Sequence, residues 1–133
     1  MSGGISSMNK TLSVLQLVLA ILYVMAGIWK LTGEGPILQE TMPGFSLFLI
    51  HAVGLAETLA GLCLALPVIV RKWDVAAAWA GAFLAVEAAI FVVHHLRHGA
   101  YGPAAVTLVL GLLASFIAWK RFKTRERGGS ATV

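Results

Sequence analysis

The sequence predicts an all-α fold: a bundle of four transmembrane helices with both termini in the cytoplasm. Of the 133 residues, 59% are hydrophobic and only 12% are charged, too few to cover the surface of a soluble domain this size. The apolar residues gather in four long stretches, and the basic residues gather on one side of them. We therefore expect a single membrane domain over residues 1–133, without an internal repeat.

The four apolar stretches are long enough to cross a bilayer as helices. They cover residues 12–31, 45–70, 75–95 and 103–119, each close to the ~20 residues that span about 30 Å of hydrocarbon. Lipid offers the backbone no hydrogen-bond partner, and the stretches lack the alternation of barrel strands, so helices are expected. The first stretch exceeds the ~7–15 residue core of a signal peptide, and no clear cleavage site follows it. We expect it to remain as a mature helix.

Small residues predict close packing between these helices. Ala77, Gly81 and Ala85 recur every four positions in the third stretch, and Gly54 and Gly61 lie seven apart in the second. Small residues on one helical face let a neighbouring helix approach closely. The pattern favours a compact bundle over four separated spans.

The basic residues predict the orientation in the membrane. With four spans, the N-terminus, the second loop and the C-terminus share one side. That side carries eight of the ten basic residues, and the other side carries only Lys30 and Arg97. The eight are Lys10, Arg71, Lys72, Lys120, Arg121, Lys123, Arg125 and Arg127. The positive-inside rule then places both termini in the cytoplasm, for a multi-pass protein of the plasma (inner) membrane.

Aromatic residues agree with this orientation. Trp73 and Trp119 would lie at the inner interface, and Trp29, Phe45 and Tyr101 at the outer one. Tryptophan and tyrosine are enriched at both membrane interfaces. Charge and aromatic placement therefore predict the same topology.

The basic run at 120–127 suits lipid better than nucleic acid. Basic residues just inside the last span fix topology and contact anionic headgroups. We expect the lipid bilayer as a partner and no nucleic acid, although the pI is near 9.7. Residues 124–133 are predicted to form a flexible tail.

Ionisable residues gather in the middle and outer part of the predicted bundle. By helical rise, Glu57 lies about 18 Å in from Phe45, and Glu87 lies about 10 Å below His94. The inner part has only Gln16 as a deep polar group, so plain packing is expected there. The outer group consists of Lys30, His51, Glu57, Glu87, His94, His95, Arg97 and His98.

A charge at mid-bilayer costs several kcal/mol unless it is paired, protonated or hydrated, so Glu57 and Glu87 should face the interior. Two roles are open for Glu57. It could fix helix packing, as one partner of an ion pair or as a protonated acid, or it could bind a ligand or a proton. Glu87 and His94 lie about 20° apart around the helix and could share water or a proton. Lys30 could instead be an interfacial residue that extends its amine to the headgroups.

Metal and thiol chemistry are not expected. His94 and His98 have the spacing of two metal ligands, but zinc usually takes three or four protein ligands. The single cysteine, Cys63, allows no internal disulfide and no Cys-x-x-Cys motif. Tyr23 and Met25 are expected in the core or facing lipid. No catalytic residue is predicted.

Two motifs resemble the DoxX-like family of small four-helix membrane proteins. The first span, "LVLAILYVMAGIWKLTG", has Lys-Leu beginning three positions after a glycine, and the second contains "GLAETLAGLCLALP". The motifs cover the first half of the chain, and the four-span hydropathy covers all of it. The resemblance matches the family's lysine and glutamate to Lys30 and Glu57 and implies that they are partners in a polar centre. Glu87 and the histidines match no family pattern.

The resemblance also implies a function class, since some DoxX-like proteins are subunits of quinone-linked oxidoreductases. The first hypothesis is a small subunit or accessory protein that binds a quinone-like or other amphipathic ligand in the outer half. Lys30, His51, Glu57 and Glu87 would contact the ligand, and His94, His95 and His98 would form a polar network. The chain has no haem, flavin or iron–sulfur ligand set, so electron transfer would need a partner. That partner would be a redox enzyme or another membrane subunit.

Two alternatives stay open. The chain could be a non-catalytic assembly or interaction protein in which Lys30 and Glu57 are purely structural. Less favoured is a proton-coupled exporter of small molecules, which at this size would have to work as a homo-oligomer although inverted repeats are not visible. No cofactor is expected within the chain itself, with quinone as a candidate ligand.

Overall fold

The computed structural model describes residues 2–70 and 74–131, and within these ranges the fold is entirely helical. The five helices are α1 (Ser2–Thr32), α2 (Gly35–Thr41), α3 (Leu47–Val70), α4 (Asp74–Arg97) and α5 (Tyr101–Ala131). Four of them are long and apolar enough to cross a membrane, as predicted. These spans are Lys10–Thr32, Leu47–Val70, Val75–Arg97 and Tyr101–Lys123.

The helices extend beyond the predicted spans at both ends of the chain. α1 begins at Ser2, and α5 continues to Ala131 through most of the segment predicted as a flexible tail. Hydropathy marks where a chain leaves the hydrocarbon, whereas backbone hydrogen bonding continues wherever the sequence tolerates a helix. Arg71, Lys72 and Trp73, which entered the orientation argument, lie outside the described residues.

The short helix α2 was not predicted from the sequence, which placed a loop at residues 32–44. α2 has only seven residues and carries a proline in its first turn, where a missing N–H does no harm. Leu38 is fully buried and Met42 is 4% exposed, and both pack with Ile50 and Phe91. These tertiary contacts hold a helix too short to be stable alone.

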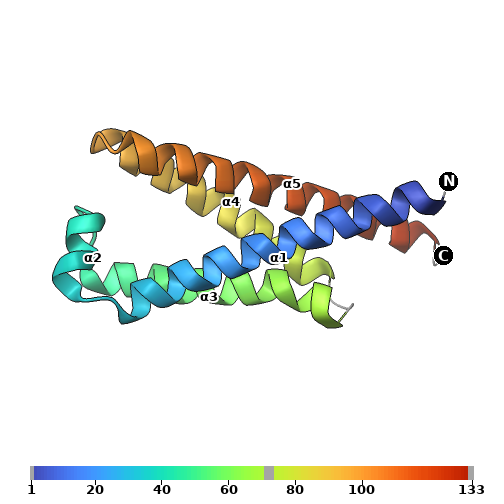
Figure 1. The fold of residues 1–133 in the computed structure, drawn as a ribbon, viewed down its shortest axis with the longest axis horizontal. Coiled ribbons are helices and arrows are strands. Elements are labelled where there is room, and N and C mark those ends of the chain that lie inside the picture. The colour runs from blue at the N-terminus through green and yellow to red at the C-terminus, as the bar shows by residue number, and fades with distance from the viewer. Residues whose placement is uncertain (1, 71–73, 132–133) are drawn as a thin grey trace.

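The long helices form two pairs, α1 with α3 and α4 with α5. α3 and α4 connect the pairs, while α1 and α5 contact each other much less. The pairs approach each other toward the half with the two chain ends and diverge toward the half with α2 (Figure 1). We call these the terminal half and the α2 half.

Small residues let the paired helices pack closely, as predicted. A Cβ atom on Gly54 of α3 would lie 2.8 Å from the main-chain oxygen of Gly27 on α1. A Cβ atom on Gly81 of α4 would lie 2.9 Å from the main-chain oxygen of Ala114 on α5. Each pair therefore depends on a glycine at its closest approach.

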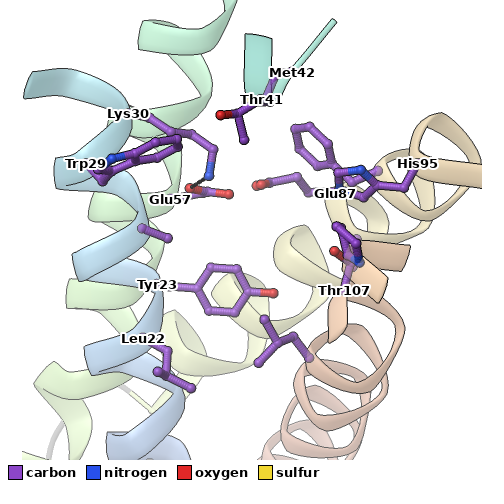
Figure 2. Close-up of a pocket in the computed structure, with 15 residues that line it drawn as sticks. Leu22, Tyr23, Trp29, Lys30, Thr41, Met42, Glu57, Glu87, His95 and Thr107 are labelled. Atoms are coloured by element: carbon purple, nitrogen blue, oxygen red, sulfur yellow. Dashed lines mark hydrogen bonds and ion pairs between the residues drawn. The ribbon is translucent and has the colours of Figure 1, made fainter. Parts of the chain in front are cut away.

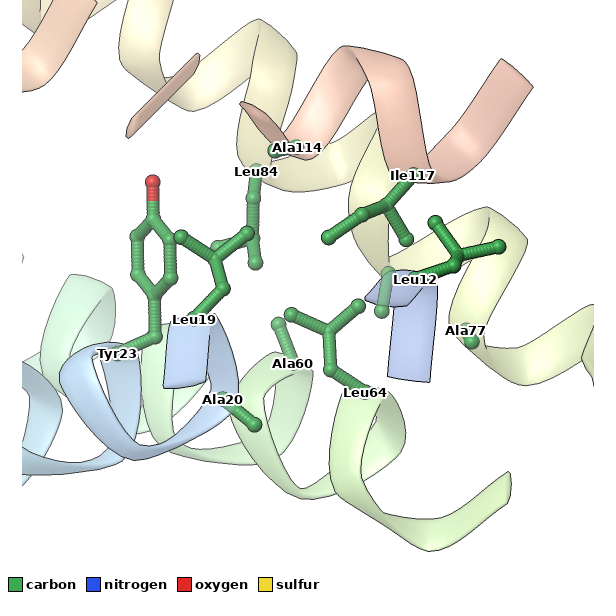
Figure 3. Close-up of a cluster of buried hydrophobic side chains, with 11 residues drawn as sticks. Leu12, Leu19, Ala20, Tyr23, Ala60, Leu64, Ala77, Leu84, Ala114 and Ile117 are labelled. Carbon is green, nitrogen blue, oxygen red and sulfur yellow. The ribbon is translucent and has the colours of Figure 1, made fainter. Parts of the chain in front are cut away.

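The core of the terminal half is built by all four long helices. Leu19, Leu64, Leu84 and Ile117 are at most 1% exposed and lie in one buried cluster (Figure 3). Since they come from α1, α3, α4 and α5 in turn, this cluster joins the two helix pairs. Interior packing of this kind leaves little space for a ligand.

The terminal half also contains a buried polar connection, so the expectation of plain packing there is wrong. Gln16 Nε2 donates to the main-chain oxygen of Leu64 at 2.6 Å, and Arg121 Nε donates to Gln16 Oε1 at 2.8 Å. Gln16 is fully buried and Arg121 is 9% exposed. The basic pattern assigned Arg121 to the cytoplasmic charges but could not show that its side chain folds back into the bundle.

Candidate functional site

A cavity of about 260 Å³ lies between the two helix pairs in the α2 half. α1, α3, α4 and α5 all contribute side chains to it, and Thr41 and Met42 line it from the end of α2 (Figure 2). It forms where the pairs diverge, because the side chains of four splayed helices no longer meet in the middle. The polar residues Lys30, Glu57 and Glu87 all line it.

Lys30 and Glu57 form a buried ion pair on one wall of the cavity. Lys30 lies in the last turn of α1, and Glu57 lies about 15 Å along α3 from Leu47 by helical rise. Lys30 Nζ is 2.8 Å from Glu57 Oε2, and the side chains are 13% and 6% exposed. The pairing predicted for these two residues is confirmed, and the alternative of an interfacial lysine is wrong.

Glu87 faces this pair from α4, with its carboxyl group directed toward Glu57 (Figure 2). Glu87 Oε2 is buried and accepts no hydrogen bond from any residue that the structure describes. A buried carboxyl oxygen without a donor costs about 1–3 kcal/mol or more. The cavity therefore contains one acid that is paired with a lysine and one that has an unsatisfied oxygen.

Aromatic side chains form much of the remaining wall. Tyr23 and Trp29 come from α1, and Phe91 comes from α4. Tyr23 is 7% exposed, as expected for the core, and its hydroxyl group points into the cavity (Figure 2). Met25 is 63% exposed, which agrees with a lipid-facing residue. The cavity thus offers flat apolar surfaces beside its charged groups.

The three histidines predicted as a polar network lie next to one another, with the His94 and His95 ring centroids 5.8 Å apart, but they do not all line the cavity. His95 lines the cavity, whereas His94 and His98 line a separate outer groove with Phe45. The His94 ring lies 4.4 Å from the Phe45 ring and 4.3 Å from the His98 ring, between centroids. His98 Nδ1 donates to the His94 main-chain oxygen at 2.9 Å.

Glu87 and His94, predicted to share water or a proton, make no direct hydrogen bond with each other. Seven residues of helical rise separate them by about 10.5 Å. The Phe45 ring packs against His94, and His94 Nε2 is buried without a hydrogen-bond partner in the described part of the chain. Helical periodicity predicted the shared face correctly but not the neighbours of that face.

His51 does not line the cavity. Its Nδ1 lies 2.8 Å from the main-chain oxygen of Lys30, so this nitrogen must donate, because a carbonyl oxygen only accepts. His51 therefore holds the end of α1 against α3, while the Lys30 side chain faces the cavity. The structure does not support His51 as a direct ligand contact.

Some residues that line the cavity were missed in the sequence. Tyr23 could have been found, since Tyr23, Ala26 and Lys30 share one helical face at spacings of three and four. Thr41 and Thr107 could not, because no periodicity relates α2 and α5 to α1. Among the described residues, no group of three or more His, Cys, Asp or Glu side chains could hold a metal ion.

The fold and the cavity define a multi-pass helical membrane protein with a polar cavity inside its bundle. The sequence model of the DoxX-like family matches residues 14–117, and the chain belongs to this family. The match includes Lys30 and Glu57 and extends through Glu87, beyond the motifs of the first two spans. The chain matches no curated protein and no solved structure.

Proposed function

We propose that this protein binds a small amphipathic molecule with a flat ring, such as a quinone, in the cavity of the α2 half. The observation that carries the proposal is the buried Glu87 Oε2, which accepts no hydrogen bond from the described residues and lies beside an open space in a membrane bundle. Ionisable residues inside membrane proteins are rare and most often mark a functional site. The ion pair between Lys30 and Glu57 supplies further polar contacts.

The shape and lining of the cavity support a ring-bearing ligand. Ligand sites are mostly apolar, with a few placed polar groups, and this cavity combines aromatic walls with three ionisable side chains. Its volume of about 260 Å³ suits a ring headgroup better than a whole long-chain lipid. A hydrophobic tail would leave the bundle between α1 and α5, whose contact is weak.

We further propose that both termini face the cytoplasm of the plasma (inner) membrane, and that the protein acts beside a redox enzyme or another membrane subunit. The start of α1 and the end of α5 lie in the same half of the bundle, as this topology requires (Figure 1). Cysteines introduced at Glu34 and Gly129 test the orientation in intact cells. An impermeant thiol reagent should label the first and not the second, and the reverse would overturn it.

Thermal unfolding in detergent with a panel of short-chain quinones tests the ligand proposal. A ligand that binds only the folded state stabilises it by about 2.7 kcal/mol at one hundred times its dissociation constant. The gain should shrink in Ala26→Leu, which fills part of the cavity, and persist in Met25→Leu, a neighbouring change on an exposed side chain. If no quinone or other amphipathic ring compound raises the unfolding temperature, the proposal is wrong.

A second candidate, a non-catalytic assembly protein, is favoured by one observation. The ion pair between Lys30 and Glu57 joins α1 to α3 beside the close glycine contact, which is a sufficient structural reason for both charges. Under this alternative, purification in mild detergent would recover a partner membrane protein, and Glu87→Gln would leave that recovery unchanged.

A further inference from the structure

An ionised Glu87 would leave the charges that line the cavity unbalanced. Two acids, Glu57 and Glu87, face one lysine, and Lys30 is already paired with Glu57 at 2.8 Å. His95 also lines the cavity, but no ion pair within 4.0 Å joins it to Glu57 or Glu87. A carboxylate at this depth is stable only beside a positive partner or water.

The walls around this acid suit a cation. Tyr23, Trp29 and Phe91 line the same cavity as Glu87. The faces of aromatic rings attract ammonium groups, most strongly where water is excluded. A carboxylate among aromatic rings is therefore a combination that recognises an organic ammonium.

Hydrogen bonding favours the same ligand chemistry. Glu87 Oε2 lacks a donor, and a protonated amine supplies up to three N–H groups. A quinone oxygen only accepts, so it can bond to Lys30 or the Tyr23 hydroxyl but leaves a Glu87 carboxylate unsatisfied. The ligand that matches every group is a ring compound that also carries a basic amine.

We propose that the cavity selects amphipathic amines, with the ammonium group paired with Glu87 and the ring between Tyr23, Trp29 and Phe91. This inference rests on the proposed function and narrows its ligand class from amphipathic ring compounds to cationic ones. The Lys30–Glu57 pair stays intact and excludes a second positive charge from that wall.

Three matched probes test the selection on the purified full chain in a neutral detergent. 4-Butylbenzylamine carries a charge and donors, 4-butylbenzyl alcohol carries one neutral donor, and its methyl ether carries no donor. Calorimetric titration at pH 7 should rank the affinities as amine, alcohol, ether. Because the amine adds an opposite charge and an attraction to the ring faces to the hydrogen bond that the alcohol can also donate, it should bind at least about tenfold more tightly than the alcohol.

Variants locate the source of the preference. Glu87→Gln removes the charge but keeps the shape, and it should bring the amine and the alcohol to similar affinities. Glu40→Gln, the same change on an exposed residue outside the cavity, should keep the full ratio. If Glu87→Gln does not fold, Phe91→Leu keeps the acid and should weaken amine binding about threefold through the lost ring face.

The outcomes separate this inference from the proposed function. An amine that binds no better than the alcohol, or an advantage that persists in Glu87→Gln, overturns the selection for amines. In that case binding of the alcohol or a quinone still supports the proposed function. If none of the ring compounds binds, the proposed function fails, and the inference fails with it.

Discussion

The two halves of the bundle treat buried polar groups differently, although the same four helices build both. In the terminal half, Gln16 both donates to Leu64 and accepts from Arg121, and apolar side chains fill the space around it. In the α2 half, Glu87 Oε2 has no donor and faces a cavity. Gln16 is hydrogen-bonded inside a packed core, whereas Glu87 lies beside an open cavity.

This difference shows that a polar residue in a membrane span is informative only together with its partners. Gln16, Arg121 and the Lys30–Glu57 pair are satisfied within the protein, and each connects helices. Glu87 Oε2 has no hydrogen-bond partner among the described residues, so it is the group that a ligand, water or another chain can satisfy. The divergence of the helix pairs produces the space in which that partner can bind.

The largest expected effect comes from breaking the ion pair. Glu57→Leu leaves Lys30 buried without its counter-ion and should destabilise the protein by about 3–5 kcal/mol. The double variant Lys30→Met with Glu57→Leu should recover most of that loss, because no buried charge remains. Thermal unfolding in detergent measures both, and strictly additive losses would show that the two side chains are not coupled.

The next effect concerns the close contact that positions this pair. Gly54→Ala places a Cβ atom 2.7 Å from Lys30 Cβ and 2.8 Å from the Gly27 main-chain oxygen, so α1 and α3 must separate. We expect a loss of about 1–3 kcal/mol. Gly102→Ala is the matched control, since its Cβ atom would meet nothing within 4 Å. Equal stability of the two variants would contradict the packing argument.

A smaller loss of stability is expected from a change in the terminal half, and it tests whether the two halves are independent. Gln16→Leu removes two hydrogen bonds from the terminal half and leaves the Arg121 donor without this acceptor, at a cost of about 1–2 kcal/mol. Ligand affinity should not change, because Gln16 does not line the cavity. Calorimetric titration checks this, and a loss of affinity comparable to that of Glu87→Gln would show that the halves are not independent.

The smallest stability effect should accompany a large loss of binding. Ala26→Leu enlarges a side chain that lines the cavity. Because the added carbons enter open space, we expect the free energy of unfolding to change by less than about 0.5 kcal/mol. Affinity for a ring-bearing ligand should fall at least tenfold because the added carbons occupy its space. Met25→Leu, a neighbouring change on a 63% exposed side chain, should affect neither quantity. Unchanged binding in Ala26→Leu would place the ligand elsewhere.

More of the fold than of the candidate site could be predicted from the sequence. Residue pattern and length predicted the four spans to within a few residues at most of their ends, since the hydrocarbon thickness fixes helix length. The cost of buried charge, with the family resemblance, predicted the Lys30–Glu57 pair. The same reasoning placed His51 and His94 at the site, and the structure shows both in other contacts. Periodicity specifies the face of a helix but not which neighbour covers it.

By itself, the sequence determined that four apolar helices form, which of their residues are small enough to pack, and which charges cannot face lipid. Those properties follow from composition and spacing, because the bilayer acts as a solvent on each helix separately. Only the tertiary structure decided that Arg121 donates to Gln16, that α2 packs against α3 and α4, and that Glu87 Oε2 has no hydrogen-bond partner among the described residues. These facts depend on how two helix pairs cross and diverge, and that angle is set by side-chain packing among residues far apart in the chain.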